Sequence, residues 1–538
     1  MFKQLLTPVG GSLPLSFLAA SLPILAVLLL LGGLRRPAWQ AALAGLAVGL
    51  LAAVCVWRMP VGLALDSVAD GAVFALWPVM AIVVAALLVY NIAVVSGRFE
   101  AFRAWVLAHA PHDRRVVLVL IGFCFGALLE GVAGFGTPVA ITSALLILVG
   151  FPPLEALVFV LIFNTAPVAF GALGTPVTVL AAVTGLPVHA VAAMIGRQLP
   201  LMALILPFYV MALYGGPRSI RALWPMLLIA GGSFGAAQFV VSNVLDYTLT
   251  DILSSLISLI VTVLFLRLWR PAPDPDFAID DVVLAAPRPA GAPAPWQGWL
   301  PWVIISVVFV LWTSLKIPAI GEQHIPWPGL DKAISITFYR DKPYAAVWTF
   351  QPLGPGAAIM TAAVITAVAV RLSPAAFLGC AVLTLRQVWK AVVTVMLIIG
   401  LAYLINYSGL AYTLGKGVAS TGPAFVLLSP FLGWLAVMLS GSDTSGNALF
   451  GNLQVAAARQ LNLNPILFAA TNSSGGVMGK MISPQNIATG ASVVGMSAHE
   501  GRVFARTVVH SVILTVILGL LVAAQQFLAP WMIPPVGG

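Results

Sequence analysis

Two acidic residues lie inside apolar, glycine-rich segments of the chain. Glu130 is the only charged residue in the 35-residue stretch from Val116 to Gly150, and Asp443 lies in LSGSDTSGNALF (439–450). A charge at the centre of a bilayer costs about 2.5–3.5 kcal/mol even on the mildest scales, so such residues mark functional sites. A carboxylate in a low-dielectric site takes up a proton more readily than one in water, which suits proton coupling. Sodium coordination and capping of a half-helix are the alternatives.

A lone cation accompanies these acids. Lys480 lies in NSSGGVMGKMISPQN (472–486), far from the other basic residues. A cation beside helix N-termini suits a carboxylate substrate, whereas pairing of Lys480 with Asp443 would be structural. Short polar side chains nearby could bond either the substrate or their own helix backbone. The candidate substrate-binding residues are Lys480, Asn164, Thr165, Thr175, Ser442, Thr444, Asn472, Ser473, Ser474, Ser483 and Gln485.

Glycine and proline interrupt the segments that hold these residues, which indicates broken helices. Unwound backbone inside a membrane is tolerated only around a cavity or within protein. The stretch 164–176 (NTAPVAFGALGTP) aligns without gaps on 472–484 (NSSGGVMGKMISP), with an asparagine, a glycine and a proline at the same spacing. Paired interruptions of this kind in the two halves of a chain point to the binding site of a transporter.

The composition excludes a soluble protein. Of 538 residues, 61% are hydrophobic and 8% are charged, whereas soluble domains carry about 25% charged residues. The net charge of +9 comes from basic residues at the ends of apolar segments, which indicates membrane topology rather than nucleic-acid binding. The three cysteines are isolated, so we expect no disulfide framework, metal or cofactor. No HExxH, GxSxG, Ser–His or Asp–Asp arrangement is convincing, so we expect no enzyme.

The apolar segments predict many membrane crossings. Strong spans are predicted at 12–34, 38–57, 72–96, 198–214, 222–243, 252–269, 299–317, 356–370, 388–410 and 506–530. The interrupted regions 116–195 and 423–497 lie between them and bring the total to about 12–14 crossings. We therefore predict an all-α polytopic membrane protein with two inverted-topology repeats, re-entrant hairpins and broken helices.

Arginine clusters predict the orientation of these spans. The clusters at 35–36, 98–115, 218–221 and 267–270 mark one side as cytoplasmic, and the N-terminus then lies outside. The acids that fall on the outer side are Asp66, Asp70, Asp246 and Asp251. Two transmembrane halves, 1–270 and 299–538, are predicted to be joined by a cytoplasmic Pro/Ala-rich linker at 271–298. The loop 318–355 is predicted to be extracytoplasmic. The two halves then start on opposite sides, as an inverted repeat requires.

Four long motifs in the interrupted regions resemble the bacterial L-lactate permease family. They are GFCFGALLEGVAGFGTPVAITSALL (122–146), FNTAPVAFGALGTPV (163–177), FLGWLAVMLSGSDTSGNALF (431–450) and TNSSGGVMGKMISPQNIA (471–488). The resemblance covers almost the whole chain and fades at the linker and at the loop 318–355. It implies proton-coupled uptake of L-lactate, with D-lactate and glycolate as companions, across the inner membrane of a bacterium. It also implies a superfamily of ion transporters that place polar motifs at the tips of re-entrant hairpins, where Asn164 and Asn472 would lie.

The residues and the resemblance together define an expected mechanism. Lys480 and half-helix N-termini would bind the carboxylate of a small monocarboxylate, and Glu130, with Asp443 second, would carry the proton. Protons and membrane lipids are the other expected partners, and homo-oligomerisation stays open. The alternative within the same superfamily is sodium-coupled transport of a di- or tricarboxylate, for which more buried Arg and Lys residues are expected. An intramembrane enzyme and a passive channel are more distant alternatives.

Overall fold

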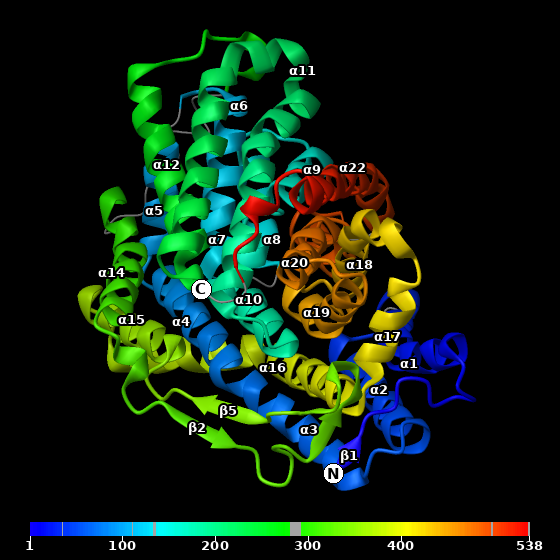
Figure 1. Ribbon diagram of the computed structural model, residues 1–538. Coiled ribbons are helices and arrows are strands. Elements are labelled where there is room, and N and C mark those ends of the chain that lie inside the picture. Colours follow the sequence, from blue (N-terminus) through cyan, green and yellow to red (C-terminus); the bar gives the residue numbers. More distant parts are fainter. Residues whose placement is uncertain (35, 110, 133–135, 280–291, 497–498, 536–538) are drawn as a thin grey trace.

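The computed structural model describes residues 1–538 except 35, 110, 133–135, 280–291, 497–498 and 536–538. Helices dominate this part of the chain (Figure 1), which confirms the all-α class. Within the described residues, ten helical stretches are long and apolar enough to cross a membrane. The number is eleven if one bent pair of helices is counted as a single span. The protein is therefore a multi-pass membrane protein. Of the predicted linker 271–298, residues 280–291 lie outside the described residues.

The first half contains one short strand and most of the predicted spans. Its elements are β1 (Phe2–Lys3), α1 (Leu13–Leu28), α2 (Ala38–Leu51), α3 (Val61–Phe74), α4 (Ala81–Val95), α5 (Arg98–His109), α6 (Arg114–Val117), α7 (Gly126–Val132), α8 (Thr137–Leu148), α9 (Pro153–Phe163), α10 (Gly171–Thr184), α11 (Val188–Val244) and α12 (Thr250–Leu268). The helix α11 has 57 residues, or about 86 Å at 1.5 Å per residue, against a membrane core of about 30 Å. It turns back at Gly216, whose φ of 64° favours glycine.

The second half begins with one helix and a short β-region. Its elements are α14 (Leu300–Ser314), β2 (Gln323–Pro326), β3 (Ile334–Ile336), β4 (Lys342–Pro343), β5 (Val347–Phe350), α15 (Pro355–Ala369), α16 (Pro374–Ser408), α17 (Leu410–Ala419), α18 (Phe425–Ser440), α19 (Asp443–Gln460), α20 (Pro465–Lys480), α21 (Pro484–Val493) and α22 (Glu500–Phe527). The helix α16 starts well before the span predicted at 388–410, because Ser373 caps its N-terminus and Pro374 occupies the first turn.

The β-region lies in the loop 318–355. β2 pairs with β5 in antiparallel register, and β3 pairs with β4. The strand β1 at the N-terminus pairs in parallel with β3, so the first residues and this loop lie on the same side of the helices (Figure 1). This agrees with the prediction that both are extracytoplasmic, and the side itself stays a prediction.

The segment 116–150 folds back as a hairpin. The stretch 115–132, π-helical in its middle, is wholly buried. Gly136 then adopts a φ of 81° and α8 follows, with a proline in its first turn. The 12 residues of α8 span about 18 Å, too short to cross a core of about 30 Å. The helix α8 packs back against α7 and the π-helical segment.

A second break separates α9 from α10. The two helices are bent by 64°, and the chain between them runs through Asn164 and Thr165 to Gly171. Ala172, Leu173 and Gly174 all have positive φ values before the helix settles at Thr175. The predicted interruption at 164–176 is therefore present in the structure.

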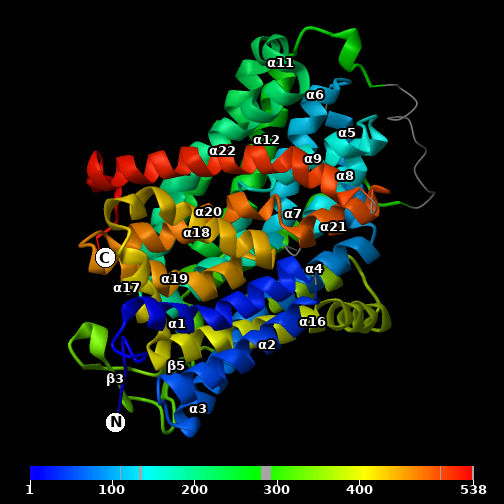
Figure 2. The same cartoon turned by 90° about the vertical axis from the view of Figure 1, so that its right-hand side faces the viewer.

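The stretch 472–484 is also interrupted, but only after Lys480. Asn472 lies in the middle of the continuous helix α20, so its expected place at a hairpin tip is wrong. The glycines of this segment serve close helix packing instead: an added Cβ at Gly475 would overlap the carbonyl oxygen of Pro430, and one at Gly479 that of Trp434. The helices α18, α20 and α22 consequently run side by side (Figure 2).

Gly475→Ala should destabilise this layer. Because the added methyl meets backbone, which cannot yield as a side-chain tip does, we expect a loss of about 1–3 kcal/mol in unfolding free energy. Gly379→Ala is the matched control, since nothing lies within 4 Å of an added Cβ on this exposed position of α16. The control should gain about 0.5–1 kcal/mol from helix propensity. Thermal unfolding in detergent measures both, and equal melting temperatures for the two variants would refute the packing argument.

The interrupted elements of the two halves contact one another reciprocally. The helix α10 packs on α19, and α8 packs on α21. The chain breaks at different points in the two aligned stretches, so their residues do not correspond one to one. The organisation in two inverted repeats, with halves at 1–270 and 299–538, stays a prediction.

Candidate functional site

A buried ion pair joins the two halves of the chain. The Nζ of Lys480 lies 2.6 Å from the Oε1 of Glu130, and both side chains are almost fully buried. The Nδ2 of Asn164 donates to the other carboxylate oxygen, Oε2, at 3.0 Å. Three of the residues predicted from the sequence therefore meet at one point. Asp443, the alternative partner of Lys480, is not its ion-pair partner.

Chain breaks position each member of this group. Glu130 lies on α7 near the end of the buried stretch, Asn164 caps the C-terminus of α9, and Lys480 is the last residue of α20. An added Cβ at Gly171 would lie 3.0 Å from the Oε1 of Glu130, so glycine there lets the break before α10 approach the carboxylate. The Nδ2 of Asn486 donates to the carbonyl of Lys480 at 3.2 Å and satisfies part of the α20 terminus.

Asp443 is the centre of a second polar group. Its Oδ2 accepts from the Oγ of Ser473 at 2.6 Å and from the Nδ2 of Asn447 at 3.0 Å. Its Oδ1 has no hydrogen-bond partner among the described residues. Asn472 extends the group by donating to the Oδ1 of Asn447 at 2.9 Å and accepting from Gln454 at 2.8 Å. These bonds tie α19 to α20.

Ser474 faces a different neighbour. Its Oγ donates to the Oε1 of Gln198 at 2.7 Å, and the Nε2 of Gln198 donates to the Oγ1 of Thr471 at 3.1 Å. The same amide nitrogen lies 3.3 Å from the Oε1 of Gln525 on α22. Ser474 thus joins α20 to α11 and is separate from the ion pair.

The remaining predicted residues lie mostly at helix ends. Thr165 donates to the carbonyl of Ile162, and Ser442 and Ser483 cap the N-termini of α19 and α21. These three side chains serve the backbone in this arrangement. Thr444 is half-buried in the first turn of α19, Thr175 is buried at the start of α10, and Gln485 is exposed on α21.

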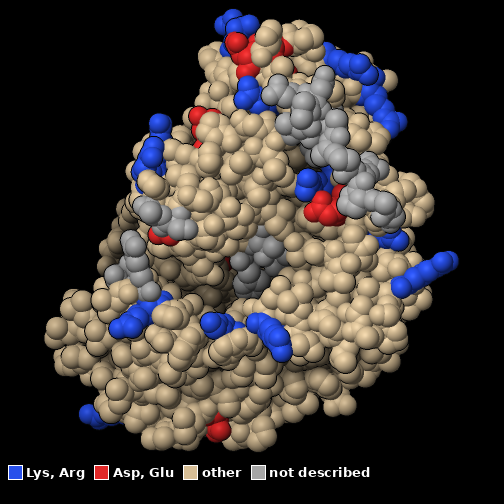
Figure 3. Space-filling model, turned by 180° about the vertical axis from the view of Figure 1, so that it is seen from behind, with Lys and Arg blue, Asp and Glu red and all other residues tan. Residues whose placement is uncertain are grey.

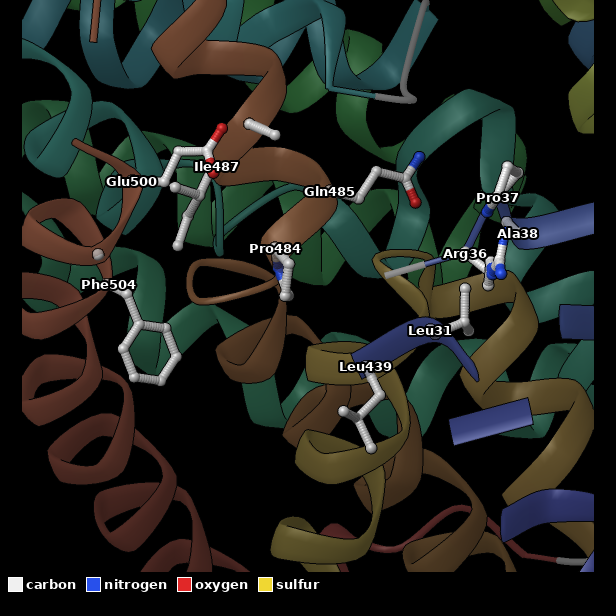
Figure 4. A pocket seen from close by; sticks show the side chains of 12 residues that line it. Leu31, Arg36, Pro37, Ala38, Leu439, Pro484, Gln485, Ile487, Glu500 and Phe504 are labelled. Atoms are coloured by element: carbon white, nitrogen blue, oxygen red, sulfur yellow. The ribbon is translucent and has the colours of Figure 1, made fainter. Parts of the chain in front are cut away.

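Gln485 lies between two pockets at one end of the helices. A pocket of about 570 Å³ places Gln485 between Glu500 and Arg36 (Figure 4). A second pocket of about 430 Å³ reaches from Gln485 to Ser440, Ser442 and Ser445. Among the described residues, neither pocket is lined by the Glu130–Lys480 pair. The pair is therefore closed off from these openings in this arrangement.

Basic side chains gather on one face of the molecule. In Figure 3 this face is hollowed near its centre, and Lys and Arg side chains lie around the hollow and outnumber the acidic ones. Such a face is expected to be cytoplasmic under the positive-inside rule.

Sequence reasoning missed several polar residues of the site. Asn447 and Gln454 are buried and bond predicted residues. Asp251 is fully buried in the first turn of α12, and its predicted place toward the outer side stays a prediction. An added Cβ at Gly131 would lie 2.8 Å from its Cβ, so Asp251 packs directly against the residue after Glu130. The sequence signal for a buried polar face here was the repeated hydroxyl residues of TDILSSLIS (250–258) within an apolar span.

Buried ionic and amide groups at helix breaks within a multi-pass bundle define a membrane transport protein rather than an enzyme. A model of the L-lactate permease family matches residues 16–529. The L-lactate permease of Salmonella typhimurium is 40% identical over 98% of this chain and 98% of that protein. The L-lactate permease of Bacillus subtilis is 38% identical over 99% and 100%. The chain therefore belongs to the L-lactate permease family.

Two further proteins are similar to this chain, one in sequence and one weakly in structure. The glycolate permease GlcA of Escherichia coli is 38% identical over 99% of both chains. Among solved structures, the YdaH transporter of Alcanivorax borkumensis is 15% identical, with a TM-score of 0.46 over 87% of this chain and 89% of that chain. The latter likeness is too weak to carry an argument.

Proposed function

We propose that this protein takes up L-lactate together with protons across the cytoplasmic membrane of a bacterium, and that it also accepts D-lactate and glycolate. Its family and its relatives named for L-lactate and glycolate support the choice of substrate. The substrate is a small monocarboxylate with one charge, and one lysine with oriented amides suffices to bind it.

The observation that carries the proposal is the Lys480–Glu130 pair. In this arrangement Lys480 is neutralised by Glu130 at 2.6 Å. A lactate carboxylate can replace Glu130 as the partner of Lys480 only if the Glu130–Lys480 ion pair opens. An ionised Glu130 left unpaired in the interior would be costly. Protonation of Glu130 removes that charge. One proton then enters with each lactate anion, and the buried site stays neutral.

Neighbouring side chains complete the proposed substrate-binding site. Asn164, freed from Glu130 when that carboxyl is protonated, can hydrogen-bond the substrate carboxylate or hydroxyl. Asp443 is the second candidate for proton coupling, because its Oδ1 is buried without a partner among the described residues. Ser473 and Asn447 already bond its other oxygen, so Asp443 ranks after Glu130.

Purified protein in liposomes tests this function. Adding lactate outside should acidify the interior, glycolate should do the same, and succinate should not, because a second carboxylate has no second buried cation to meet. An imposed pH difference should drive lactate accumulation equally with and without a sodium gradient. Lactate entry without proton movement, or entry that requires sodium, would contradict the proposal.

A further inference from the structure

Asp251 is a buried carboxyl group without a partner. Its side chain is 0% exposed, and no described residue bonds either of its oxygens. An ionised carboxylate without a donor in the protein interior is strongly unfavourable, whereas the protonated form is tolerated. A proton on Asp251 would remove this cost in the present arrangement, in which the Lys480–Glu130 pair is closed.

Asp251 lies beside the residue that follows Glu130 and near the end of α12. It packs against Gly131, the residue that follows Glu130, and glycine there is what permits the close approach. Five residues earlier, Asp246 is partly exposed and caps the turn before α12. That end of α12 is the one predicted to be extracytoplasmic.

Two residues close to Asp251 in the chain also carry unpartnered hydroxyl groups. Thr250 and Ser254 lie one residue before and three residues after it on the same helix, and both hydroxyl oxygens are buried without a partner among the described residues. A buried water needs two to four polar partners. These three groups are the polar side chains through which a proton would reach Asp251 in the first turns of α12.

The charged groups that act on Asp251 are Glu130 on α7 and Lys480 on α20. The other elements that pack against α12 carry few titratable groups near its first turns. These are Tyr247 and Asp246 at the 3-10 turn before α12, His189 on α11 in contact with Tyr247, and Cys124 in contact with Ser258. Glu130 is the acceptor that changes its charge partner when a substrate enters.

We propose that Asp251 relays the transported proton from the extracytoplasmic side to Glu130, an inference that rests on the proposed function. When lactate takes Lys480, the O–H bond of Asp251 breaks and an O–H bond forms on Glu130. The Asp251 carboxylate then takes a proton from water on the outer side, so one proton enters per lactate. The relay sets how fast Glu130 is loaded and leaves the stoichiometry unchanged.

The substitution Asp251→Asn tests whether Asp251 affects the rate of lactate uptake without changing the final accumulation. The asparagine has nearly the shape of the neutral acid but cannot pass a proton, so the initial rate of pH-driven lactate uptake should fall by about 100-fold, the lower end of the range for proton-transfer groups. The final accumulation and the proton-to-lactate ratio should equal those of the unchanged protein. Lactate exchange at equal pH should fall much less. Asp276→Asn, on an exposed side chain, is the matched control and should change nothing.

Three outcomes would overturn the relay. A normal uptake rate in Asp251→Asn would contradict the relay and leave the proposed function intact. An equal loss of uptake, exchange and thermal stability assigns Asp251 a structural role. Sodium-dependent uptake that Asp251→Asn abolishes makes the three polar groups a cation site instead. If the unchanged protein moves no protons with lactate, the proposed function itself fails and the relay with it.

Discussion

Glu130→Gln is expected to abolish the accumulation of lactate driven by a pH difference, while exchange of internal for external lactate persists in part. Without the carboxylate, the empty protein holds Lys480 as an unpaired charge in its interior. The substrate-free form then cannot change its accessible side at a useful rate, because an unpaired buried charge is strongly unfavourable. Only the form with lactate at Lys480 remains neutral, and that form supports exchange alone.

The measurement for Glu130→Gln is labelled-lactate uptake in liposomes, with and without internal lactate. One coupled proton supports about tenfold accumulation per unit of pH difference, and we expect this ratio to fall to about one in the variant. Glu155→Gln, on an exposed residue at the start of α9, is the control and should retain the full ratio. Accumulation that persists in Glu130→Gln would show that another group couples the proton.

Lys480→Met should cost both stability and binding, and a second substitution should separate the two losses. Removing one partner of a buried pair leaves the other charge uncompensated, which destabilises by about 3–5 kcal/mol. Adding Glu130→Gln removes that charge as well, so the double variant should recover most of the lost unfolding free energy. Lactate affinity should not recover, because no cation remains for the carboxylate.

Thermal unfolding in detergent and lactate binding to the purified variants give the two readouts. Lys390→Met, on an exposed lysine of α16, is the control for loss of a positive charge and should affect neither. If the double variant regained lactate affinity together with stability, Lys480 would hold the helices together and nothing more.

Much of this molecule could be predicted from its sequence because the membrane imposes strong rules. Long apolar segments predicted the spans, and the lone Glu130 with the prolines and glycines around it predicted an interrupted element, with a hairpin, two spans and one broken helix all left open. Lys480 and Asn164 were also predicted as site residues. Their meeting with Glu130 was not, since nothing local in a sequence places residues 350 positions apart in contact.

The errors have specific physical causes. Glycines in a helix can mark either a break or a close approach, and the choice depends on the neighbouring helix. In α20 the carbonyls of Pro430 and Trp434 lie so close to Gly475 and Gly479 that these glycines serve close packing and not a break. The burial of Asp251 was not foreseen, because the sequence does not show that the hairpin carrying Glu130 packs on the first turn of α12.

The Glu130–Lys480 pair also bears on how the protein is made. The two residues are 350 positions apart in the chain, so at about 5–20 residues per second Glu130 is synthesised roughly 20–70 s before its partner exists. During that interval the hairpin carrying Glu130 has no buried cation to receive it. We therefore expect this hairpin to wait in the nascent protein, protonated or near water, and to reach its final place only after α20 has left the ribosome.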